Sequence, residues 1–177
     1  MDRVANPLEA IGELLAGRAR PVIALDRLAP SATYDLQYRI AVIAAAFELH
    51  AKPAGQSDRR ILAPRLKLLQ FIACRPWLLD MVRKWSKAQG DAQLLLATSQ
   101  RLRHGYLGDQ THEEVISFLI ARGMLAWSAP HVKKGPGYEW LRQVYAASTE
   151  QELFCAERAV LKDLLGIRIT NPMLEGW

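Results

Sequence analysis

Cysteine, histidine and long apolar stretches are scarce in this chain of 177 residues, and each absence excludes a class of protein. Its two cysteines, Cys74 and Cys155, lie far apart in apolar helical contexts, which predicts buried free thiols rather than a disulfide framework. No apolar stretch approaches the roughly 20 residues that a membrane span requires. Charged side chains interrupt residues 1–20, so no secretory signal is recognised. We therefore expect a cytoplasmic protein with no membrane partner.

Motifs that carry catalysis or hold a metal are also missing. The histidines and cysteines show no zinc-ligand spacing, and residues 135–137 lack the arrangement of a phosphate-binding loop. No Gly-x-Ser-x-Gly nucleophile elbow occurs. His112, Glu113 and Glu114 open a predicted helix, where carboxylates suit the positive helix end better than they suit acid–base chemistry. We expect no catalytic residues, no metal, no cofactor and no enzymatic activity.

The residues that are present favour a packed protein with an anionic partner. Hydrophobic residues make up 50% of the chain, which is enough for a real core. The net charge of +5 is compatible with nucleic acid and equally with an acidic protein. Charge alone does not choose between these partners.

The first part of the chain, residues 1–104, is predicted to be helical. Its strongest helix runs from Ser31 or Thr33 to about Ala51 and is apolar nearly all round, which predicts burial between neighbours. Weaker patterns predict helices at residues 6–17, 58–74, 77–88 and 92–103.

The second part, residues 105–177, is predicted to be a winged-helix-like module with a C-terminal helix and tail. Thr111 and Glu114 form a capping box for a helix that Gly123 ends. A short apolar strand follows at residues 124–127, and alternation of side chains predicts a second strand at residues 138–145. The fold class expected is therefore mainly α with a small β-hairpin.

The last helix is predicted to begin after this hairpin. Ser148 and Gln151 have the spacing of another capping box, and Gly166 ends the helix. The tail that follows is apolar and ends in Trp177, so we expect it to fold back or to dock on a partner.

Basic residues in the predicted loop between the two strands are candidates for nucleic-acid binding. His131, Lys133 and Lys134 would lie at a wing tip and contact phosphate. They could equally form a solvated loop, or the hairpin could pair with another protein. Arg59 and Arg60 begin a basic stretch that either follows a nucleic-acid backbone or forms the solvated face of an amphipathic helix.

Aromatic residues are the candidates for a protein interface. The chain has five tryptophans, and tryptophan and tyrosine are common anchors of interfaces. The candidate anchors are Trp77, Trp85, Tyr138, Trp140 and Trp177.

The order of these features resembles a known family. The alanine-rich helix at Tyr34–Leu49 precedes Arg65-Leu-Lys-Leu-Leu-Gln-Phe-Ile72, and Gly105-Tyr-Leu-Gly-Asp109 leads into Glu114-Val-Ile-Ser-Phe-Leu-Ile-Ala-Arg-Gly123 and the hairpin. Over residues 30–165 this layout is similar to the middle component of bacterial ABC-three-component systems, the Lamassu-type anti-phage assemblies. The resemblance implies a non-catalytic adaptor that joins an SMC-like ATPase to an effector such as a nuclease, with double-stranded DNA reached through the complex.

The alternative function is that of a DNA-binding winged-helix transcriptional regulator. It would place the helix at residues 111–122 in the major groove. Glu113 and Glu114 in the first turn of that helix would be repelled by phosphate, which counts against this hypothesis.

Overall fold

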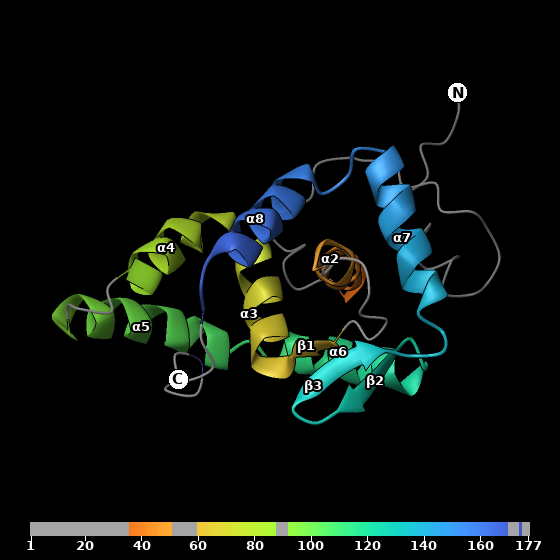
Figure 1. Cartoon of the computed structure of the whole chain (residues 1–177), viewed down its shortest axis with the longest axis horizontal. Helices are drawn as coiled ribbons and strands as arrows, with labels where there is room; N and C mark the ends of the chain where they lie inside the picture. The colour runs from red at the N-terminus through yellow and green to blue at the C-terminus, as the bar shows by residue number, and fades with distance from the viewer. Residues whose placement is uncertain (1–35, 51–59, 88–91, 170–173, 175–177) are drawn as a thin grey trace.

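The computed structural model describes residues 36–50, 60–87, 92–169 and 174, and it is mostly helical with a small antiparallel sheet (Figure 1). The mainly α fold class is therefore confirmed at this level. Arg59, Trp177 and the helix predicted at residues 6–17 lie outside the described residues. No helix in the described part of the chain is both long and apolar enough to cross a membrane.

Helix α2 (Leu36–Leu49) forms the centre of the fold, as predicted for the helix that is apolar nearly all round. Every residue from Tyr38 to Phe47 is buried. Four helices pack against it: α3 (Ala63–Ala73), α6 (Thr111–Ala121), α7 (Glu139–Glu150) and α8 (Cys155–Gly166). Figure 1 shows α2 nearly end-on, with α3, α7 and α8 around it. Its small alanine side chains keep these contacts close.

Among the described residues, the sheet has three strands: β1 (Arg60–Leu62), β2 (Leu125–Ser128) and β3 (His131–Lys134), in the order β1-β3-β2. Both pairings are antiparallel. Strand β2 confirms the strand predicted at residues 124–127. The helix predicted at residues 58–74 starts only at Ala63, and residues 60–62 form strand β1 instead. This strand was not predicted, because its partner β3 is distant in sequence.

The strand predicted at residues 138–145 is wrong, because this segment begins helix α7 (Glu139–Glu150). The real second strand of the hairpin is β3, inside the segment that was predicted to be a loop. Spacing explains the error. Tyr138, Leu141 and Val144 recur every three residues and are all buried, which is the pattern of a helix that packs on one side.

Both predicted capping boxes are wrong, whereas both predicted glycine ends are close to the real ones. Helix α6 has Gln110 as its N-cap, without a side-chain cap, and Ser148 lies inside α7. Helix α8 (Cys155–Gly166) starts later than predicted and ends at Gly166 as predicted. After α6, Gly123 has a φ of 69°, and its N–H donates to the carbonyl of Ile120, so glycine ends this helix as expected.

Two helices connect α3 to α6. The 3₁₀ turn η2 (Pro76–Leu78) leads into α4 (Leu79–Lys87), which agrees with the short helix predicted at residues 77–88. Helix α5 (Ala92–Leu107) confirms the helix expected at residues 92–103 and packs on α4. The boundary predicted between residues 104 and 105 falls inside α5, and β1 pairs with β3 across it.

Candidate functional site

One face of the sheet carries basic side chains, and we call it the outer sheet face. Side chains alternate along a strand and directly paired residues share a face, so the register places six residues together. These are Arg60, Leu62, Ala126, Ser128, His131 and Lys133. None of the six is buried, and none is acidic. The other face carries Ile61, Val132 and Leu125 into the core.

Arg60 and Lys133 are direct cross-strand partners on this outer face. Like charges placed opposite each other destabilise a sheet unless an anion lies between them. No carboxylate in the described part of the chain forms a salt bridge with either residue. His131 lies two positions along β3 on the same side. The sheet therefore joins three of the five residues predicted to bind nucleic acid, and Arg59 lies outside the described residues.

Lys134 does not belong to this group, and the prediction of a basic wing tip is wrong. The turn of the hairpin is Ala129–Pro130, which carries no charge. Lys134 faces the opposite side of the sheet, where its Nζ lies 2.8 Å from Glu48 Oε1 and 3.7 Å from the centre of the Tyr138 ring. The Tyr138 hydroxyl donates to the same carboxylate oxygen over 2.7 Å. These contacts join β3 to α2 and to the start of α7.

The predicted interface residues divide into buried and exposed side chains. Trp85 is only 2% exposed, and Tyr138 is also buried, so both serve the core. Trp140 is half-buried. Trp77 is 71% exposed, and Trp127, which was predicted only to lie in a short apolar strand, is 56% exposed. The residues before Trp127 in the sequence are apolar, and nothing in that pattern indicates that β2 is an edge strand.

The two exposed tryptophans lie on different parts of the fold. Trp77 is in η2, which packs on α3, α4 and α8, whereas Trp127 is in β2, which packs on α6 and β3. In Figure 1, α4 lies at the upper left and β2 at the lower right.

A buried ion cluster connects α2 to the segment before α6. Arg39 Nη1 lies 2.9 Å and 3.0 Å from the two carboxylate oxygens of Asp109 and hydrogen-bonds to Oδ2. Arg75 Nη1 reaches the same Oδ2 over 3.2 Å. The side chains of Arg39 and Asp109 are 0% and 1% exposed, so this is a structural ion pair deep in the protein. Sequence analysis did not predict it.

His112 and Gln70 extend the polar cluster. His112 is buried, its Nδ1 hydrogen-bonds to Oε1 of Gln70, and the Gln70 amide donates to the backbone carbonyl of Arg39 over 3.2 Å. Burial lowers the pKa of His112 to about 4, so the ring is neutral near neutral pH. His112 is thus a packed core residue.

The two cysteines have different environments. Cys74 is a buried free thiol, as predicted, and burial raises its pKa to about 12. Cys155 is exposed, so the prediction that it is buried is wrong. It lies in the first turn of α8 on the solvent side, where its sulfur is 3.2 Å from Arg158 Nη2.

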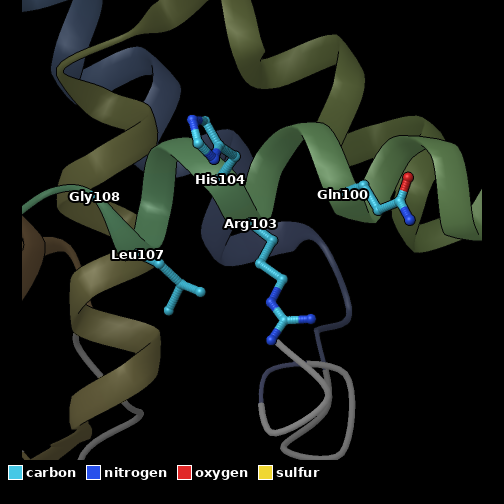
Figure 2. A pocket seen from close by; sticks show the side chains of 5 residues that line it. All are labelled: Gln100, Arg103, His104, Leu107 and Gly108. Atoms are coloured by element: carbon cyan, nitrogen blue, oxygen red, sulfur yellow. The ribbon is translucent and has the colours of Figure 1, made fainter.

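A stripe of exposed residues along α5 lines a shallow hollow. The stripe consists of Gln100, Arg103, His104, Leu107 and Gly108, which recur at helical spacing (Figure 2). Figure 2 shows Arg103 and Leu107 extending from the same side of the helix. Leu107 is 51% exposed. In the described part of the chain, no three histidine, cysteine or acidic residues gather in a way that could hold a metal ion.

Comparison with protein-family models, with curated proteins and with solved structures finds no match for this chain.

Proposed function

We propose that the chain is a non-catalytic adaptor subunit that joins an SMC-like ABC ATPase to an effector, such as a nuclease, in a bacterial anti-phage complex of the Lamassu type. The observation that carries the proposal is the pair of exposed tryptophans on separate elements, Trp77 at 71% and Trp127 at 56% exposure. Large exposed aromatic side chains are typical anchors of protein interfaces. Two such anchors on separate elements, η2 and β2, suit two different partners.

The order of the helices and strands supports the same proposal. Helix α2, strand β1, helices α3 and α6, and strands β2 and β3 follow the helix–strand–helix–helix–strand–strand order of a winged helix, and β3 lies between β1 and β2. In this interpretation α4 and α5 are an insertion between the two later helices. Winged-helix subunits act as connectors in SMC-like machines, which is the role that the sequence resemblance implies.

The test is a pull-down of the tagged chain expressed with its operon neighbours, with every co-eluting chain identified by mass. Wild-type protein is expected to retain a long coiled-coil ATPase and a second subunit. Trp77→Ala and Trp127→Ala should each weaken one partner by about 30-fold or more, as loss of an interface anchor does. Leu107→Ala, which removes an exposed apolar side chain elsewhere, is the matched control and should retain both. Elution without any neighbour would refute the adaptor function.

A DNA-binding regulator is the second candidate, and the outer sheet face favours it. Arg60 and Lys133 present positive charge there beside His131, and no carboxylate of the described residues forms a salt bridge with Arg60 or Lys133. Against it, Glu113 and Glu114 are exposed on α6, the helix that would enter the major groove. Binding of duplex DNA by the isolated chain, with a steep dependence on salt concentration and loss on Lys133→Ala, would favour the regulator.

A further inference from the structure

The hydrogen-bond pattern of the hairpin sets the direction of each backbone group in β2. The amide of Gly135 donates to the carbonyl of Met124 over 3.0 Å, which marks these two residues as a hydrogen-bonded pair that extends the β2–β3 ladder. Such pairs alternate along an antiparallel ladder, so Ala126 also bonds to β3. The N–H and C=O groups of Leu125 and Trp127 therefore point away from β3, toward the open edge of the sheet.

Within the described residues, this edge of the sheet lacks the protection that natural proteins give to edge strands. Charged side chains, proline within the strand and covering segments usually block the addition of another strand. Strand β2 is Leu-Ala-Trp-Ser and contains neither a charge nor a proline. No turn or loop amide of the described chain hydrogen-bonds to the carbonyl of Trp127, and the indole is 56% exposed. The strand is short, so the site accepts a short segment.

The side chains around this edge restrict the chemistry of the segment that would bind. A residue opposite Trp127 would share the face of its indole, which favours an apolar side chain. In the bound segment, the residues before and after the one opposite Trp127 would lie on the outer sheet face. They would be next to Ala126 and Ser128, and Lys133 and His131 lie beyond these on β3, two strands away from the segment. The distance from the bound segment to β3 is two strand spacings, about 10 Å. A glutamate of the segment and Lys133 can span this distance together, because the side chain of Ala126 between them is small.

We propose that β2 receives an extended acidic segment of a protein partner as a fourth, edge strand of the sheet. The segment alternates acidic and apolar residues, with an apolar side chain against Trp127 and carboxylates toward Lys133 and His131. Strand addition supplies affinity through main-chain hydrogen bonds and specificity through alternate side chains. The proposal rests on the adaptor function proposed above and names the way in which one of the two partners binds.

The experiment uses the full isotope-labelled chain and two synthetic peptides, one of alternating glutamate and valine and one of alternating lysine and valine. The acidic peptide should shift the backbone amide signal of Trp127 and slow its hydrogen exchange, and the basic peptide should bind at least about tenfold more weakly. Equal binding of the two peptides, or no change at Trp127 with millimolar acidic peptide, would overturn the proposal.

Two variants of one residue isolate the backbone contribution. Trp127→Ala and Trp127→Pro both remove the indole, but only proline also removes the outward N–H, and edge strands tolerate proline at such positions. The proline variant should bind the acidic peptide about fivefold more weakly than the alanine variant, as loss of one hydrogen bond predicts. Equal affinities would refute strand addition. Should the proline variant not fold, as judged by circular dichroism, Lys133→Glu replaces it and must reverse the preference between the two peptides.

Two further outcomes separate this proposal from its alternatives. If Trp127→Ala and Trp127→Pro bind the acidic peptide equally well while wild-type protein retains its partners in the pull-down, strand addition is wrong and the adaptor function stands. If wild-type protein retains no partner while the acidic peptide still binds at Trp127, the adaptor function is wrong and the edge site stands. Duplex DNA that shifts the signals of Arg60 and Lys133, while neither peptide shifts the Trp127 amide, would assign the outer sheet face to nucleic acid and overturn the proposal.

Discussion

Replacing Asp109 by asparagine should destabilise the protein strongly, although the two side chains have almost the same shape. The carboxylate lies between Arg39 Nη1, at 2.9 Å, and Arg75 Nη1, at 3.2 Å. Arg39 is 0% exposed and Arg75 is 14% exposed, so neither guanidinium is well hydrated. The neutral amide would leave two cations close together without the charge that compensates them.

The expected loss follows from what is known of buried ion pairs. Removing one partner of such a pair costs about 3–5 kcal/mol, because the remaining charge is buried and uncompensated. Small domains have only about 5–15 kcal/mol of stability in total, so the urea midpoint should fall sharply. The measurement is urea unfolding, followed by far-ultraviolet circular dichroism and by tryptophan fluorescence.

A matched control separates the buried pair from ordinary surface electrostatics. Glu113 Oε1 lies 3.1 Å from Lys67 Nζ and the Glu113 side chain is 67% exposed. Glu113→Gln should therefore cost no more than about 1 kcal/mol. High salt should abolish the small effect of Glu113→Gln and leave the effect of Asp109→Asn, since buried charges are poorly screened. If Asp109→Asn costs as little as Glu113→Gln, the assignment of a structural buried pair is wrong.

Two further predictions concern close backbone packing and pH. Gly135→Ala should lower the free energy of unfolding by more than about 1 kcal/mol, because its Cβ would lie 2.3 Å from the carbonyl oxygen of Gly123, whereas Gly166→Ala meets nothing within 4 Å and should be neutral or slightly stabilising in the same thermal melt. Burial lowers the pKa of His112 to about 4, below its ordinary value near 6.5, so the neutral ring stabilises the fold above about pH 6.5 and that stabilisation is lost as pH falls toward 4. His112→Gln should therefore remove part of the acid-induced loss of stability between pH 7 and 5, and an unchanged pH profile would show that another group is responsible.

Local patterns in the sequence predicted several of the helices, although not α7. The segment that became α2 is apolar on every side, and that pattern correctly indicated a helix buried among others. Gly123 correctly predicted the end of α6, because the left-handed conformation after a helix suits a residue without a side chain. Such signals lie within a few residues of one another, so sequence alone carries them.

The pairing of the strands and the exposure of side chains depend on contacts between residues far apart in the sequence, which local patterns do not predict. Arg60 pairs with Lys133, and no short-range pattern connects two residues so far apart in the chain. In the segment from Tyr138, large side chains at Tyr138, Trp140 and Val144 fit the two-residue period of a strand, which favoured the wrong prediction. The side chains that are buried in the fold, Tyr138, Leu141 and Val144, follow the period of a helix. Lys134 was misjudged for a related reason, since its position next to Lys133 gave no hint that the two would face opposite sides of a sheet.

The central position of α2 has a consequence for synthesis on the ribosome. Helices α3, α6, α7 and α8 all pack on it, and all four come later in the chain. At roughly 5–20 residues per second, about 5–20 seconds separate the emergence of α2 from that of α8. For that interval a helix that is apolar nearly all round lacks the neighbours that cover it in the finished fold. The nascent chain is therefore expected to need a chaperone, and mutations that slow the docking of α7 or α8 should reduce yield more than they reduce the stability of the finished protein.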